Sequence, residues 1–87
     1  MKTSVLICAE REPTLLSQVV RELYFQMVTP EMLHAEAMGA HTLRIRLEVE
    51  CDEWRLLRLL ARWKEIVGVQ TVVLNRLDGA ELSGARP

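Results

Sequence analysis

The feature of this sequence that most constrains its fold is the strict polar–apolar alternation of residues 42–50, Thr-Leu-Arg-Ile-Arg-Leu-Glu-Val-Glu. Successive side chains of a β-strand point to opposite faces of its sheet, so this run predicts a strand with one apolar and one polar face. Leu43, Ile45, Leu47 and Val49 make up the apolar face. A strand of this kind packs against a core on one side only.

A second alternating run, residues 31–38, precedes it across a short glycine-containing loop, and together the two runs predict a β-hairpin. Opposed residues on paired strands share a face, so the two apolar sets must oppose each other. Pairing Ala37 with Leu43 satisfies this and sets Glu36 opposite Arg44, a favourable cross-strand pair. A two-residue turn would carry Glu36 into the core. We therefore expect a loop with an odd number of residues.

Two segments carry apolar residues at helical spacing. The first helix is expected to begin at Pro13, because the first helical position needs no N–H, and to end near Gln26. Its predicted apolar stripe consists of Leu15, Leu16, Val19, Val20 and Leu23. The second helix is expected to follow Asp52, whose carboxylate can cap it, and to stop at Gly68.

Residues 3–9 are a short apolar run that predicts a buried strand, and residues 69–76 predict the last strand. The order β-α-β-β-α-β predicts an α+β, ferredoxin-like sandwich, in which a four-stranded antiparallel sheet carries two helices on one face. Right-handed crossovers place the first and third strands in the middle of the sheet. We expect this domain to span residues 1–76 and residues 77–87 to form a flexible C-terminal tail.

Length and charge exclude several classes of protein. The 87 residues suffice for one small domain, and a net charge of −1 with dispersed Lys and Arg predicts no nucleic-acid partner. No signal peptide and no apolar run of membrane-spanning length is visible, so we expect a cytoplasmic protein without a membrane association. Cys8 and Cys51 are interpreted as small buried thiols rather than as a disulfide or metal ligands.

Residues able to carry out catalysis are scarce. His34 and His41 fall at different heights of the predicted hairpin, and a metal ion there would need Glu36 as well, so we interpret them as surface histidines. No serine lies in a nucleophile-elbow context, and the glycines are too scattered for a phosphate-binding loop. The sequence predicts no catalytic residue, no metal and no cofactor, and hence a role in regulating or supporting another protein.

The two tryptophans, Trp54 and Trp63, lie nine residues apart on the second predicted helix, roughly 180° around its axis. Both cannot be centred on one buried stripe. Either each covers an edge of the core, or one of them contributes to a contact with a partner protein, where Trp is enriched.

Residues 9–21, Ala-Glu-Arg-Glu-Pro-Thr-Leu-Leu-Ser-Gln-Val-Val-Arg, follow the first predicted strand. This segment resembles the strand-loop-helix of ACT domains, the small ligand-sensing modules of amino-acid metabolism. The stretches at 12–21, 44–50 and 59–69 are similar, more closely, to the short small subunit of acetolactate synthase. The resemblance extends over residues 3–76 in order and spacing.

This resemblance implies a non-catalytic regulatory subunit that activates a large thiamine-diphosphate-dependent catalytic subunit in branched-chain amino-acid biosynthesis. It places a branched-chain amino-acid effector near Glu12, Thr14 and Leu15. The ACT pattern, however, has an acidic residue two before the proline and a glycine after it, where this chain has Arg11 and Thr14. The glycine admits an effector's carboxylate to the helix amides, and the acid holds its ammonium group. Their replacement predicts little or no feedback inhibition, as in the short, valine-insensitive type of subunit.

ACT domains typically pair side by side through the second strand, which here contains Leu33, Ala35 and Ala37 and lacks the prolines and lysines that block edge pairing. The resemblance therefore implies a homodimer. Two alternatives stay open: a free-standing or transport-associated ACT-type amino-acid-sensing module, and an unrelated ferredoxin-like protein such as a small enzyme or metal chaperone. The CxxC of metal chaperones and the arginine–asparagine constellation of acylphosphatases are absent from the sequence.

Overall fold

The alternating run of residues 42–50 forms β3 (Thr42–Glu50), one of the two central strands of an antiparallel sheet. Its central neighbour is β1 (Lys2–Glu10), and the strand order is β2-β3-β1-β4. The edges are β2 (Met32–Met38) and β4 (Val69–Arg76). The prediction that the first and third strands lie in the middle is confirmed.

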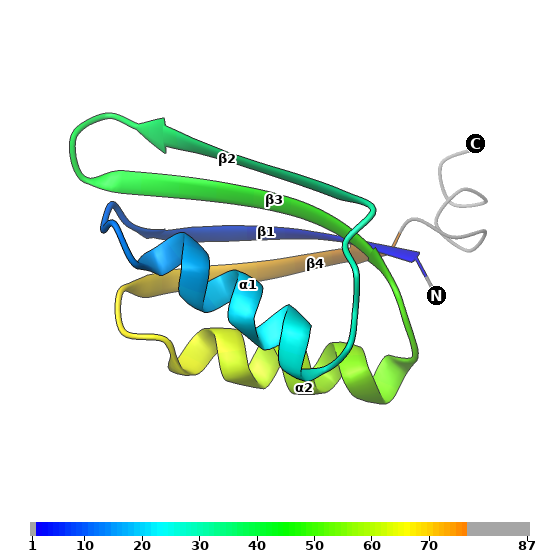
Figure 1. Ribbon diagram of the computed structural model, residues 1–87. Coiled ribbons are helices and arrows are strands. Elements are labelled where there is room, and N and C mark those ends of the chain that lie inside the picture. The colour runs from blue at the N-terminus through cyan, green and yellow to red at the C-terminus, as the bar shows by residue number, and fades with distance from the viewer. Residues whose placement is uncertain (1, 77–87) are drawn as a thin grey trace, which may run out of the picture.

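The helices α1 (Leu15–Phe25) and α2 (Glu53–Glu65) cover one face of this sheet, as Figure 1 shows. This computed structural model describes residues 2–76. Over that range the predicted α+β, ferredoxin-like βαββαβ sandwich is confirmed. The predicted tail at 77–87 lies outside the described residues.

The register of the β2–β3 hairpin follows from its apolar residues. Ala37 pairs with Leu43 and Glu36 with Arg44, and the three residues 39–41 connect the strands. Arg44 Nη2 donates a hydrogen bond to Glu36 Oε2 at 2.9 Å on the face away from the helices. Gly39 has φ +78°, a left-handed conformation that suits glycine. The predicted pairing and the odd loop length are both confirmed.

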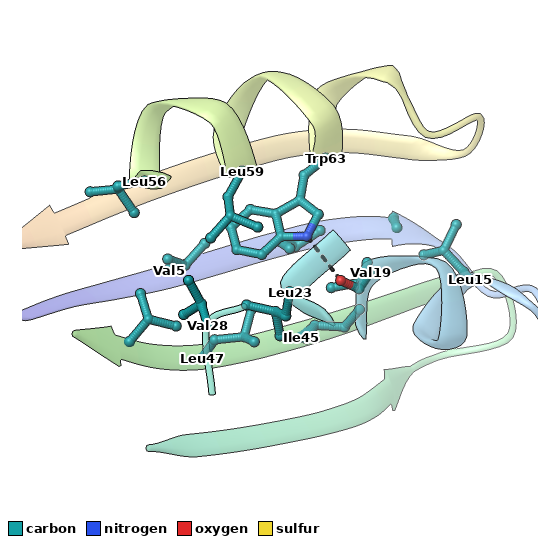
Figure 2. Packing of buried hydrophobic residues seen from close by; sticks show 13 residues of the cluster. Val5, Leu15, Val19, Leu23, Val28, Ile45, Leu47, Leu56, Leu59 and Trp63 are labelled. Carbon is teal, nitrogen blue, oxygen red and sulfur yellow. Dashed lines mark hydrogen bonds between the residues drawn. The ribbon is translucent and has the colours of Figure 1, made fainter. Parts of the chain in front are cut away.

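The core lies between the two helices and the covered face of the sheet. It takes alternate residues from β1 and β3, because a strand shows every second side chain to the same side. Trp63 of α2 is its largest fully buried side chain, and its indole Nε1 donates a hydrogen bond of 3.1 Å to the carbonyl oxygen of Val19 on α1 (Figure 2). The buried hydrophobic residues are Val5, Ile7, Ala9, Leu15, Val19, Leu23, Val28, Ile45, Leu47, Val49, Leu56, Leu59 and Trp63.

Two details of the helix ends differ from the sequence predictions. Helix α1 begins at Leu15, not at Pro13, because residues 13 and 14 form a turn in which the Leu15 N–H bonds to the Glu12 carbonyl at 3.2 Å. Asp52 occupies the N-cap position of α2 but makes no side-chain cap. Its carboxylate lies 3.6 Å from Arg55 instead, so the ion pair replaces the expected capping bond.

The apolar stripe of α1 is narrower than predicted. Leu15, Val19 and Leu23 are buried and Leu16 is partly buried, whereas Val20 is exposed. Glu22 is buried instead, beside α2, where it accepts a hydrogen bond from Arg62 Nε at 3.2 Å. Within residues 2–76, neither helix has the length and apolar character required to span a bilayer.

Candidate functional site

The candidate effector region is the connection between β1 and α1. Glu12 and Thr14 are exposed there, whereas Leu15 is buried in the core. The Thr14 hydroxyl accepts a hydrogen bond from Gln18 Nε2 at 3.2 Å, and the Thr14 carbonyl accepts one from the Ser17 hydroxyl at 2.8 Å. Thr14 is thus engaged with its own helix, and Leu15 contributes packing.

Arg11 makes two hydrogen bonds to the loop between β2 and β3. Its backbone N–H bonds to the His41 carbonyl at 3.0 Å, and its guanidinium Nη1 donates to the Gly39 carbonyl at 3.1 Å. Both acceptors belong to the β2–β3 loop, 28 or more residues along the chain. Arg11 therefore connects the β1–α1 loop to the hairpin, a role that only its unusual residue type in this position could have suggested from the sequence.

A shallow hollow of about 340 Å³ lies beside the contact of Arg11 with the hairpin loop. Among the three candidate effector residues, only Glu12 lines it, together with Glu10, Arg11, His41, Thr42 and Gln70. Thr14 and Leu15 do not line it, so the structure does not bring the three residues together around one cavity. The Arg11 cation therefore lies at this hollow beside the carboxyl-bearing residues Glu10 and Glu12.

The edge strand β2 is the second candidate surface. Leu33, Ala35 and Ala37 share the face that the helices cover elsewhere, because they pair with core residues of β3. Their solvent exposure nevertheless differs: Leu33 is 37% exposed, Ala35 is partly buried and Ala37 is exposed. The helices lie over the centre of the sheet and leave this strip of β2 open (Figure 1).

The two tryptophans of α2 have opposite environments, as their spacing implies. Trp63 is fully buried: its indole lies in the core and donates a hydrogen bond to α1, so it offers no surface to a partner. Trp54 is 55% exposed, and the guanidinium carbon of Arg55 lies 5.1 Å from its ring centroid. Trp54 alone stays a candidate for contact with another protein.

The histidines lie at the surface of the hairpin. His34 Nε2 is 2.9 Å from Glu36 Oε1, and His41 is in the exposed loop. Hydrogen bonds from His34 and then from Arg44 hold the pKa of Glu36 below its ordinary value. Across the part of the chain that is described, no three His, Cys, Asp or Glu side chains gather as a metal site would require.

The two cysteines are reduced and partly buried in the described structure. Cys51 follows β3 directly, and burial raises the pKa of its thiol. A raised pKa leaves less thiolate at neutral pH and hence lower reactivity. This environment agrees with the interpretation of Cys51 as a packing residue.

Comparison with known proteins places the fold. No protein-family model and no curated protein matches the sequence. Among solved structures, the ACT domain of the GTP pyrophosphokinase from Chlorobium tepidum superposes with a TM-score of 0.75 at 14% identity, over 86% of this chain and 97% of that one. The chain has the ACT-domain fold.

Two further solved structures have a similar fold. An uncharacterised protein from Thermotoga maritima gives a TM-score of 0.73 at 19% identity, over 88% of this chain and 96% of its own. The regulatory subunit of aspartate kinase from Thermus thermophilus gives 0.68 at 17% identity, over 85% of this chain and 50% of its own. At such identities the shared property is the ACT fold itself.

Proposed function

We propose that this chain is a cytoplasmic, non-catalytic regulatory subunit that activates a thiamine-diphosphate-dependent acetolactate synthase and responds weakly or not at all to branched-chain amino acids. The ACT fold and the sequence resemblance to the short small subunit of that enzyme support the proposal. The observation that carries it is the position of Arg11, whose guanidinium bonds to Gly39 where an effector-binding ACT domain needs an acid.

Arg11 bears on effector binding through charge. A free amino acid presents an ammonium group and a carboxylate, and a guanidinium within a few ångströms of the ammonium is repulsive. Thr14 adds a side chain at the helix start, and its polar groups already bond to Ser17 and Gln18. The charge of Arg11 and the local contacts of Thr14 both disfavour an amino acid here, and weak valine binding follows.

Calorimetry with valine, leucine and isoleucine tests this part. We expect no saturable heat from the wild-type chain and measurable valine binding by the double variant Arg11→Asp, Thr14→Gly, which restores the acid and the glycine. Arg21→Asp is the matched control, because Arg21 is exposed on α1 and the substitution makes the same change of charge. Tight binding of any of the three amino acids to the wild-type chain would overturn the insensitive assignment.

The homodimer is part of the same proposal, with β2 as its interface. The strip of Leu33, Ala35 and Ala37 is apolar and only partly covered, and an edge strand presents unpaired backbone groups that a second copy can pair with. Sedimentation is expected to show a dimer. Ala37→Lys, at an exposed position of β2, is expected to shift it towards monomer, whereas Thr71→Lys on the opposite edge leaves it unchanged. A monomeric wild-type chain would contradict this interface.

Trp54 is proposed as a contact with the catalytic subunit. Half-exposed tryptophan beside an arginine is the kind of residue that dominates protein interfaces. The assay is acetolactate formation by the catalytic subunit titrated with this chain. The wild type is expected to raise the rate to a saturating level, and Trp54→Ala to require at least about tenfold more chain. Tyr24→Ala, at another exposed aromatic residue, is the control and is expected to act like the wild type.

Failure to stimulate any such synthase would redirect the assignment to a free-standing or transport-associated ACT-type sensing module. In that case calorimetry with a broader set of amino acids becomes the deciding measurement. Equal stimulation by Trp54→Ala and the wild-type chain would remove α2 from the interface while leaving the activating role in place.

A further inference from the structure

The face of the sheet opposite the helices carries a second hollow, separate from the Arg11 region. Because both helices lie on one side, the side chains that point to the other side have no covering layer within the described residues (Figure 1). The hollow has a volume of about 300 Å³. It is lined by Ser4, Val5, Leu6, Arg44, Arg46, Val73 and Asn75.

The floor of this hollow is apolar. Leu6 of β1 lies between Arg46 of β3 and Val73 of β4 in the sheet register, so one row across the sheet reads guanidinium, leucine, valine. Leu6 is partly buried and Val73 is 53% exposed. Exposed apolar area at the centre of a polar sheet face is the area that a ligand with an aliphatic body can remove from water.

Two guanidinium groups form one wall. Arg44 and Arg46 stand two residues apart on β3 and therefore point to the same side of the sheet. Glu36 neutralises Arg44 through the bond from Nη2, but Arg46 makes no ion pair among residues 2–76. The Nε of Arg44 is buried and has no hydrogen-bond partner in the same range. The wall thus holds one cation without a carboxylate partner, and the buried Arg44 Nε lies out of reach of a ligand in the hollow.

The adjoining row supplies neutral polar groups. Ser4 of β1 pairs with Asn75 of β4, next to the Leu6–Val73 pair. A hydroxyl and a carboxamide can donate and accept hydrogen bonds without adding charge. The hollow therefore offers cations on one side, an apolar floor and a neutral polar corner, which are the features of a small-molecule site.

We propose that this hollow binds a short aliphatic hydroxycarboxylate. The carboxylate bonds to Arg46 in the bidentate geometry that guanidinium favours. The aliphatic carbons lie on Leu6 and Val73, and the hydroxyl reaches Ser4 and Asn75. A volume of about 300 Å³ is at the small end of ligand sites and suits a molecule of few carbons. Inorganic phosphate can bond to the arginines, but it has no aliphatic carbons to cover the apolar floor and would place charged oxygens against it.

The test follows the backbone amide resonances of Leu6 and Val73 in the ¹⁵N-labelled full chain during titration with 2-hydroxybutyrate, butyrate, butyramide and inorganic phosphate. We expect saturable shifts with 2-hydroxybutyrate, binding several-fold weaker for butyrate, and binding weaker by about tenfold or more for neutral butyramide. Absence of saturable shifts would overturn the proposal. Phosphate binding as tightly as the hydroxycarboxylate would overturn the assigned ligand class.

Variants separate this site from general attraction by positive charge. Arg46→Gln is expected to weaken 2-hydroxybutyrate binding about tenfold, and Arg58→Gln, at an exposed arginine of α2, to leave it unchanged. Asn75→Leu is expected to abolish the preference for 2-hydroxybutyrate over butyrate. Equal loss in Arg46→Gln and Arg58→Gln would overturn the site. Because the measurement needs no catalytic subunit and no valine, its result is independent of the proposed activating role.

Discussion

The centre of the sheet and its β2 edge carry the same alternating pattern but differ in what covers them. Leu47 of β3 and Leu33 of β2 stand opposite each other in the hairpin and point to the same face. Leu47 is fully buried, whereas Leu33 is 37% exposed. The difference arises because the core buries the inward residues of β1 and β3, whereas β2 lies at the margin of the sheet (Figure 1). Sequence pattern sets which way a side chain points, and the layer above sets whether it is buried.

The two regions therefore contribute to different free energies, the centre to folding and the edge to association. The centre removes its apolar side chains from water within one chain and so contributes to the free energy of folding. The edge keeps apolar area that only another molecule can cover, so its contribution appears in association. Comparing matched substitutions in the two regions therefore separates effects on folding from effects on the association of two chains.

Leu47→Ala is expected to have the largest effect, with a loss of about 2–5 kcal/mol in the free energy of unfolding, because truncation removes buried methyl groups and leaves a cavity. Leu33→Ala, the same chemical change one strand away, is expected to cost less than about 1 kcal/mol in the monomer. Urea unfolding at low protein concentration measures both. Equal losses would show that the edge is covered as well as the centre.

The tryptophans of α2 extend the comparison to the helix layer. Trp63→Phe is expected to cost about 2 kcal/mol, because it removes the hydrogen bond to the Val19 carbonyl and part of a buried ring. Trp54→Phe, at the exposed position, is expected to change stability by less than about 0.5 kcal/mol. Thermal unfolding of both variants checks this, and a cost at Trp54 similar to that at Trp63 would contradict the assigned environments.

The sequence was sufficient to predict the strand order and the hairpin register. The period of two in residues 42–50 leaves one choice of inward face, and a shift of one residue would have moved Glu36 into the core. Charge complementarity of Glu36 and Arg44 points to the same register, and the structure has both residues paired. Local pattern and tertiary packing agree here, so prediction from local pattern succeeds.

Sequence alone could not decide which residues of the helices are buried. The apolar face of α2 is broad, and Trp54 and Trp63 are equally apolar, so only the position of α1 shows that Trp63 is the buried one. The exposure of Val20 and the burial of Glu22 go together, because the side of α1 that carries Glu22 faces Arg62 of α2. The contact of Arg11 with Gly39 joins segments far apart in the sequence, which no local pattern reports.

Two glycines in left-handed conformations also differ in how closely other atoms surround them. Gly68, before β4, has φ +101°, and a Cβ there would lie 3.2 Å from Leu15 Cδ1. Gly39, in the hairpin loop, has φ +78° and no atom within 4 Å of such a Cβ. Gly68→Ala is expected to cost about 1–2 kcal/mol from strain and crowding, and Gly39→Ala about 1 kcal/mol from strain alone. Urea midpoints compare them, and the reverse order would contradict the packing of Leu15 against this turn.

The smallest expected effect is a pH dependence confined to the edge hairpin. His34 and then Arg44 hold the pKa of Glu36 below its ordinary value through hydrogen bonds to its carboxylate. A carboxyl whose pKa is lower in the folded state contributes stability that is complete above the unfolded value of about 4.3. That stability is lost as the pH falls through the folded pKa. Acidification is therefore expected to narrow the difference in urea midpoint between the wild type and Glu36→Gln.

Leu47→Ala supplies the control from the centre of the sheet, because it removes no titrating group. Its difference from the wild type is expected to stay constant over the same range of pH, whereas that of Glu36→Gln shrinks. The Glu36 side chain is 40% exposed, so solvent screening keeps the effect small, and a direct NMR titration of the Glu36 carboxyl is the more sensitive measurement. Arg44→Gln is expected to raise that pKa towards its ordinary value. A carboxyl that titrates identically in the wild type and Arg44→Gln would show that the ion pair across β2 and β3 does not form in solution.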